Sequence, residues 1–234
     1  MPGLDSDLLF GGLIQVLALL FAISIHESAH AWTAWRCGDA TAHALGRISL
    51  NPLRHLDPVG SLLVPVLLLV AGGPIFGWAK PTPVRVGKLR SPERDHLLVT
   101  LAGPASNLAL FGLTLIVLGI LLAILGPEAR DTAQASLLRD LPAARRGAHF
   151  PLLFSLVQFA FLNGFLGLFN LLPVPPLDGG QIALQLLPPR WAARYSALRP
   201  YGFIIVLVLA MLQVLWLLVI PVYVLIALVI QLSV

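Results

Sequence analysis

Two histidines and a glutamate lie together at the end of the first apolar stretch, in the order His26-Glu27-Ser28-Ala29-His30. In a helix, residues four apart lie on one face about 6 Å from each other, so both imidazoles can reach one metal ion. Glu27 is rotated by about 100° from His26, which directs it to a metal-bound water rather than to the metal. The H-E-x-x-H spacing therefore predicts a zinc site with Glu27 as its general base.

The rest of the chain is typical of a membrane protein. Of its 234 residues, 58% are hydrophobic and 11% are charged, whereas soluble domains carry about 25% charged residues. An ionisable group inside a membrane-spanning segment costs roughly 2.5 kcal/mol or more. A cluster of three such groups in one segment indicates a function, although the alternative is that they only mark the end of a helix.

A catalytic zinc ion uses three protein ligands and keeps a fourth position open for water, so one more ligand is needed. Asp178 is the candidate, because it is the only charged residue between His149 and Arg190 and follows a proline-rich helix end. The two glycines after it allow close backbone approach. The alternative is that Asp178 caps a helix that starts at Gln181.

Four uncharged stretches meet the length of roughly 20 residues that a spanning helix needs. They are Leu8 to Ile25, Leu97 to Leu125, Phe150 to Leu177 and Tyr201 to Val234. The first follows two aspartates and no basic residue, so we keep it in the fold rather than assign it to a signal peptide. The last can form one tilted helix or two short helices broken at Pro221. We expect an all-α polytopic membrane protein with four to six transmembrane helices, forming one domain over residues 1–234.

A fifth apolar stretch, Val59 to Ala79, is interrupted by glycines and prolines. Basic residues flank it on both sides, and by the positive-inside rule both flanks face the cytoplasm. A re-entrant segment satisfies this condition. The residues that follow, Lys80 to Val86, predict a short β-hairpin or edge strand near the active site. The same rule places His26 and His30 in the inner half of the first helix, so the active site should lie towards the cytoplasmic side.

Three segments, HESAH, LAGPASN and NLLPVPPLDGG, resemble the signature segments of the site-2 protease family of intramembrane metalloproteases. NPLRHLDP and FGWAKPTPV resemble further motifs of its compact bacterial branch, which has neither a PDZ nor a nucleotide-sensing domain. The resemblance implies one Zn²⁺ per chain on His26, His30 and Asp178, with Glu27 as catalytic glutamate. It also implies hydrolysis of peptide bonds within or near transmembrane segments of membrane-protein substrates, in a bacterial inner membrane.

The resemblance further suggests that Asn107, and Asn170 with Pro173, line the groove that holds the substrate backbone. From the residues alone, an amide in an apolar helix must form hydrogen bonds, and contact between helices would satisfy it as well as a substrate. His55 could stand near the zinc, as a support for a ligand or as an oxyanion donor, or it could be a turn histidine at the membrane interface.

Other function classes fit the sequence less well. A metal transporter should show two inverted halves, and no internal repeat is visible. A non-catalytic membrane scaffold would not need Glu27, and a different H-E-x-x-H protease would need a glutamate in a later apolar segment, where there is none. The net charge of +4 lies in loops and does not indicate nucleic-acid binding. The expected partners are a transmembrane substrate and the lipid bilayer, and no oligomeric state is implied.

Overall fold

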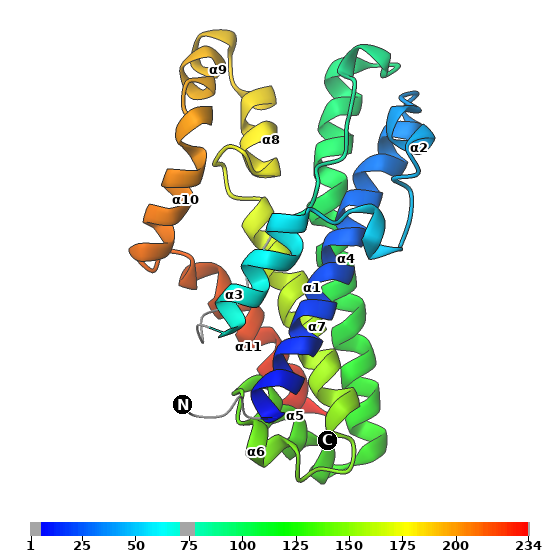
Figure 1. The fold of residues 1–234 in the computed structure, drawn as a ribbon, viewed down its shortest axis with the longest axis vertical. Coiled ribbons are helices and arrows are strands. Elements are labelled where there is room, and N and C mark those ends of the chain that lie inside the picture. Colours follow the sequence, from blue (N-terminus) through cyan, green and yellow to red (C-terminus); the bar gives the residue numbers. More distant parts are fainter. Residues whose placement is uncertain (1–5, 71–77, 234) are drawn as a thin grey trace.

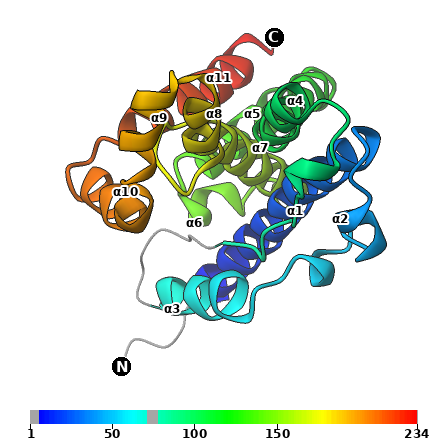
Figure 2. The same ribbon diagram turned by 90° about the horizontal axis from the view of Figure 1, so that it is seen from above.

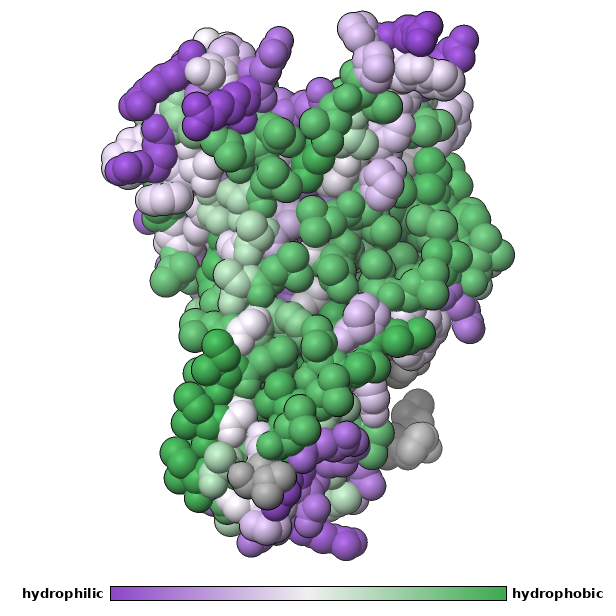
Figure 3. All heavy atoms as spheres, turned by 180° about the vertical axis from the view of Figure 1, so that it is seen from behind, coloured by the Kyte–Doolittle hydropathy of each residue, from purple (hydrophilic) through white to green (hydrophobic). Residues whose placement is uncertain are grey.

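The computed structural model describes residues 6–70 and 78–233, and this part of the chain is all-helical (Figure 1). Four helical segments are long and apolar enough to cross a membrane: Leu9–Arg36, Pro92–Leu125, Phe150–Asn170 and Pro189–Met211. On the face drawn in Figure 3, apolar residues cover the middle of the molecule and polar residues lie at both ends. The length and composition of these helices are those of an integral membrane protein.

Three long helices form the centre of the molecule: α1 (Ser6–Arg36), α4 (Pro92–Leu125) and α7 (Phe150–Asn170). Alanines on α1 that include Ala18 and Ala22 are buried against α7, where Leu162 and Leu166 cover them. Small residues let the helix backbones approach closely, which is how helices in a bilayer gain packing contacts. This tight packing holds the second half of α1, with its histidines, against the other two helices.

The largest apolar cluster lies at the opposite end of the bundle from the histidines. There, α4 and α7 pack against α5 (Pro127–Leu137) and the last helix, α11 (Trp216–Leu232), with α6 (Leu141–Ala144) beside them. This end is a closed core, and both termini of the described chain lie near it (Figure 1). The site-bearing end of the bundle is more open.

Helices α8 (Asp178–Leu186), α9 (Pro189–Ser196) and α10 (Gly202–Met211) form an arm beside the bundle, with a short 3-10 helix, η4 (Arg199–Tyr201), before α10. Figures 1 and 2 both show this arm apart from α1, with α8 as its innermost helix. The prolines after Asn170 end α7 as expected. The final apolar stretch is two helices, but the break lies over residues 212–215 and not at Pro221, which is inside α11.

The chain between α1 and α4 wraps one side of α1 (Figure 2). It contains only short helical elements. They are α2 (Thr41–Ala44), the 3-10 helix η1 (Pro52–Arg54), the π-helix η2 (Pro58–Leu63), α3 (Val64–Val70) and the 3-10 helix η3 (Val86–Lys88). The predicted re-entrant segment includes residues 71–77, which lie outside the described part. On either side of that gap, the Trp78 N–H donates to the Gly60 carbonyl over 3.1 Å.

The predicted β-hairpin or edge strand over Lys80–Val86 is wrong, because the described residues contain no strand. Lys80 to Arg85 is extended but has no β partner. Pro81 and Pro83 lack an N–H, and the Lys80 N–H donates to the His55 carbonyl over 2.9 Å. The Thr82 N–H donates to the Glu27 side chain and the Arg85 N–H to Asp39. Side-chain carboxylates thus take the place of a second strand.

Candidate metal centre

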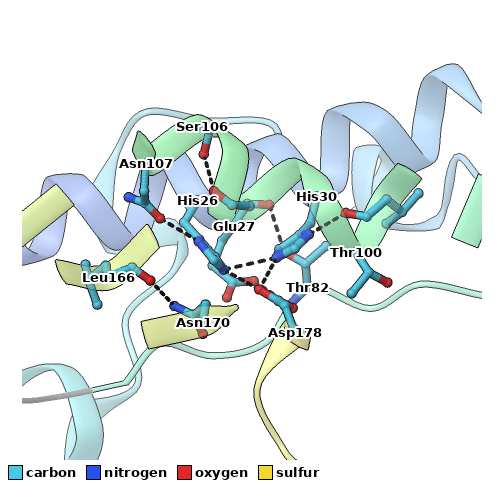
Figure 4. A network of polar contacts seen from close by, with 12 residues as sticks. His26, Glu27, His30, Thr82, Thr100, Ser106, Asn107, Leu166, Asn170 and Asp178 are labelled. Atoms are coloured by element: carbon cyan, nitrogen blue, oxygen red, sulfur yellow. Dashed lines mark hydrogen bonds and ion pairs between the residues drawn. The ribbon is translucent and has the colours of Figure 1, made fainter. Parts of the chain in front are cut away.

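His26, His30 and Asp178 meet at one point between α1 and α8 (Figure 4). The Nε2 atoms of the two histidines are 3.1 Å apart, and the Asp178 Oδ2 lies 3.1 Å from His26 Nε2 and 3.4 Å from His30 Nε2. Three ligands placed tetrahedrally about 2.0–2.1 Å from a zinc ion are separated by roughly 3.3 Å. The three atoms therefore have the spacing that a zinc ion requires.

Hydrogen bonds fix the orientation of both imidazoles. The His30 Nδ1 lies 2.7 Å from the Val99 carbonyl, which can only accept, so this nitrogen carries the proton. The His26 Nδ1 lies 2.7 Å from the Asn107 Oδ1. The amide of Asn107 cannot be reversed, because its Nδ2 donates to the Ala22 carbonyl over 3.2 Å. Both rings therefore carry their proton on Nδ1 and present an Nε2 lone pair to the same point.

The convergence of these atoms suits a cation. With both rings protonated on Nδ1, two Nε2 lone pairs and a carboxylate oxygen face each other, and the buried Asp178 Oδ2 has no hydrogen-bond partner. Acceptors at such distances repel each other unless a positive ion lies between them. Two nitrogens and one oxygen are ligands that zinc prefers, so the donor set fits zinc.

A glycine of α4 leaves the space for the two imidazole rings. A Cβ placed on Gly103 would lie 2.3 Å from the Nε2 of His30 and 2.6 Å from the Nε2 of His26. Any other residue at this position would collide with the rings and displace their Nε2 atoms. Gly103 belongs to the LAGPASN segment, where the sequence alone singled out only Asn107.

Asp178 reaches the site because the chain folds tightly after α7. Asp178 is the first residue of α8, and a Cβ on the next residue, Gly179, would lie 2.2 Å from the Leu171 carbonyl oxygen. Gly180 is similarly pressed against Val174. The two glycines allow the first turn of α8 to pack directly on the backbone that follows α7. This contact aims the carboxylate of Asp178 at α1.

Glu27 does not join the ligand set. Its Oε2 accepts the Thr82 N–H over 2.7 Å, and the Thr82 hydroxyl donates to the Glu27 carbonyl over 3.0 Å. Thr82 stands between Pro81 and Pro83, so its N–H is the only backbone donor in that tripeptide. The extended segment Lys80–Arg85 thus fixes the carboxylate of Glu27 beside the metal point.

The fully buried Asp39 anchors the other end of this segment. Burial alone would raise the pKa of Asp39, but hydrogen bonds from Thr41 and from the Arg85 N–H outweigh this effect and lower the pKa. The Asp39 Oδ2 accepts the Arg85 N–H over 2.6 Å. Asp39 therefore stays ionised and ties the segment to the end of α1.

The site opens into a cavity of about 460 Å³. His26, Glu27, His30 and Asp178 form part of its wall, and Asn170 also lines it. The Nδ2 of Asn170 donates to the Leu166 carbonyl of its own helix over 3.0 Å. The cavity is large enough for a short stretch of polypeptide beside the metal point.

The other predicted residues are not among those that line this cavity. Asn107 is fully buried between helices, where its Nδ2 also bonds to Asn163 over 2.9 Å. Pro173 is exposed and is not among the cavity residues. His55 is buried, and its Nε2 contacts the Ser49 carbonyl over 2.8 Å and the Ser28 hydroxyl over 3.3 Å. Ser28 lies between the two histidines in sequence but faces away from the cavity, so the structure does not bring His55 to the site.

Comparisons with known proteins found one matching family model and several similar sequences. A model of peptidase family M50 matches residues 14–212. YwhC of Bacillus subtilis, named as a zinc metalloprotease, is 40% identical over 194 residues, which are 83% of this chain and 78% of YwhC. Rip2 of Mycolicibacterium smegmatis, also named as a zinc metalloprotease, is 30% identical over 84% of this chain and 66% of its own. Rip2 of Mycobacterium tuberculosis is 31% identical over 85% and 67%. No solved structure matches the chain significantly.

Proposed function

Because the chain belongs to peptidase family M50, the site-2 protease family of intramembrane zinc metalloproteases, we propose that His26, His30 and Asp178 hold the zinc ion and that Glu27 is the catalytic base. The observation that carries this assignment is the convergence of two Nε2 atoms and one carboxylate oxygen, which all lie within 4.8 Å of one another. The protein is an intramembrane zinc metalloprotease.

The reaction is the hydrolysis of a peptide bond, in which the zinc and Glu27 have separate roles. Bound zinc supplies Lewis-acid chemistry, which acidifies water and polarises a carbonyl. Glu27 takes a proton from the attacking water at its free carboxylate oxygen and returns it to the leaving amine. The hydrogen bond from the Thr82 N–H holds the other oxygen, Oε2, so the base has a fixed orientation.

The substrate is a membrane protein cut within or near a transmembrane segment. A peptide bond in a helix is hidden by its own hydrogen bonds, so the chain must unwind before it can be cut. Asn170 faces the cavity and can hold the unwound backbone. We assign Pro173 to the outer edge of the same path. Asn107 and His55 receive other roles. Asn107 orients His26, which it contacts, and His55 supports α1 through its contact with Ser28.

We also propose that residues 1–234 form one catalytic domain in a bacterial inner membrane, with the active site towards the cytoplasm. The segment from Val59 to Ala79 then enters and leaves the bilayer on the cytoplasmic side. The pairing of Gly60 with Trp78 supports this path, because it puts the two ends of the segment at one level. The surplus of basic residues between α1 and α4 supports the orientation.

Zinc content and cleavage, measured on the same purified variants, test the assignment. Glu27→Gln should keep about one zinc per chain and lose cleavage by roughly 10²–10⁴-fold, since it removes only the base. His26→Ala and Asp178→Ala should lose both. Loss of zinc from Glu27→Gln, or cleavage that survives in it, would refute the roles of the base and the ligands.

A further inference from the structure

A second cavity lies on the other side of the Lys80–Pro83 segment from the metal centre. Its volume is about 470 Å³, and it lies open to the surface between that segment and the loop that runs from Leu45 to Leu56. Three cations line it, namely Arg47, Arg54 and Lys80, and none of its lining residues is acidic. Within the described part of the chain, no carboxylate forms an ion pair with any of the three. The cavity is therefore strongly positive.

Arg47 forms the inner wall of this cavity. The residue is only 7% exposed, and its Nη1 donates to the Arg54 carbonyl over 2.8 Å and to the Lys80 carbonyl over 3.4 Å. The guanidinium thus bridges the two chain segments that form the cavity. Its Nε and Nη2 have no hydrogen-bond partner among the described residues. Neither atom is among the fully buried polar atoms that lack a partner. They are free to donate to a molecule in the cavity.

Arg54 lies over the same space, and a glycine leaves room for its guanidinium. Gly46 has a φ of +68°, and a Cβ on it would lie 2.8 Å from the Arg54 Nη1. A side chain at position 46 would displace the guanidinium, so the turn is shaped to let Arg54 lie across it. Two arginines and a lysine in one open cavity repel each other, and an anion among them relieves this repulsion.

We propose that this cavity is a binding site for a phosphate group, either that of an anionic phospholipid headgroup or free phosphate. Guanidinium groups match the geometry of phosphate oxygens, and a lysine adds a mobile third donor. The predicted membrane-surface position of the loop makes headgroup phosphates a source close at hand. Lys80 and Pro81 directly precede Thr82, so a bound phosphate would steady the segment that donates to Glu27. This last consequence rests on the proposed function, whereas the binding itself does not.

The test uses the full chain in nanodiscs, with Glu27→Gln in all binding samples so that binding is measured apart from cleavage. In phosphatidylcholine nanodiscs, inorganic phosphate is titrated against chloride at equal ionic strength, and the midpoint of thermal unfolding is measured. A second set of nanodiscs contains phosphatidylglycerol. Phosphate or phosphatidylglycerol should raise the midpoint, and Arg54→Gln should weaken the response about tenfold.

Lys80→Gln is the second variant, in case Arg54→Gln does not fold, and Arg190→Gln, an exposed arginine of α9 outside the cavity, is the control. If both ligands raise the midpoint and the cavity variants weaken that response, the site binds phosphate from either source. If only phosphatidylglycerol raises the midpoint, the site is assigned to the lipid headgroup. No response to either ligand, or an equal loss in Arg190→Gln, would overturn the proposal. In active protein, either ligand should increase cleavage in the wild type and not in Arg54→Gln.

Discussion

Gly103 of α4 faces His30 of α1 so closely that a Cβ on the glycine would lie 2.3 Å from the Nε2 of the histidine. A side chain on Gly103 would collide with the imidazole, so the glycine allows the backbone of α4 to pack directly against the histidines and to form one wall of the site.

Gly103→Ala should prevent zinc binding while the protein still folds. The methyl group would displace the two imidazole rings that it meets, so zinc content should fall well below one per chain and cleavage should fall with it. Metal analysis of the purified variant checks this. Gly112→Ala is the matched control, since Gly112 lies on the same helix with no atom within 4 Å of its added Cβ. A full zinc content in Gly103→Ala would contradict the prediction.

Asn107→Leu should weaken zinc binding by roughly 10–100-fold, because the His26 ring would lose the partner that fixes its tautomer and its angle. Asn163→Leu should have a smaller effect in the same direction, since Asn163 acts only through Asn107. Competition with a zinc chelator measures both affinities. If Asn163→Leu were the more damaging variant, the order of this chain of contacts would be wrong.

Asn170→Leu should leave zinc binding unchanged and weaken cleavage of a helical substrate. If the amide holds the unwound backbone, its loss should cost roughly 1–3 kcal/mol of that state. A substrate that already unwinds easily, through a Gly-Pro pair near the scissile bond, should lose less. Both substrates are compared in the same vesicles with both enzymes. An equal fractional loss would point to helix packing, because the Asn170 Nδ2 also bonds to Leu166.

Cysteines at Leu53 and Lys88, two exposed positions on either side of the apolar stretch, should react only with a reagent applied from the cytoplasmic side. The single native cysteine, Cys37, is first replaced by alanine. A cysteine at the exposed Arg146, after α4 has crossed the bilayer, should react only from the opposite side. If Leu53→Cys and Lys88→Cys were labelled from different sides, residues 59–79 would cross the whole membrane and the re-entrant path would be wrong.

The sequence predicted the residues that differ in kind from their surroundings. His26, His30 and Asp178 are ionisable groups in apolar segments, and their expected meeting point is present in the structure. The sequence did not reveal residues that act through backbone or shape. Gly103 has no side chain to notice, and the role of Thr82 depends on its N–H. Asn163 resembled any polar residue in an apolar helix until its contact with Asn107 was seen.

The errors in the fold have a similar origin. Extended residues with alternating prolines resemble a strand, but sequence does not say which acceptors their N–H groups will find, and in this fold the acceptors are Glu27 and Asp39. Pro221 was the visible helix breaker in the last apolar stretch. It lies inside α11 without ending that helix, and the actual break occurs at Gln213, which has a positive φ of 58°.

The three proposed ligands come from two places that are far apart in sequence, two on one turn of α1 and the third on α8. A bound ion would act as a cross-link, closing a loop of about 150 residues much as a disulfide closes a chain. Besides this link, α8 packs against α4, where Gln185 donates to Thr100 over 3.4 Å, and against the chain after α7 through its two glycines. Chelation should therefore loosen the α8–α10 arm before it affects the α1–α4–α7 bundle. The metal would then have a structural role in addition to its catalytic one.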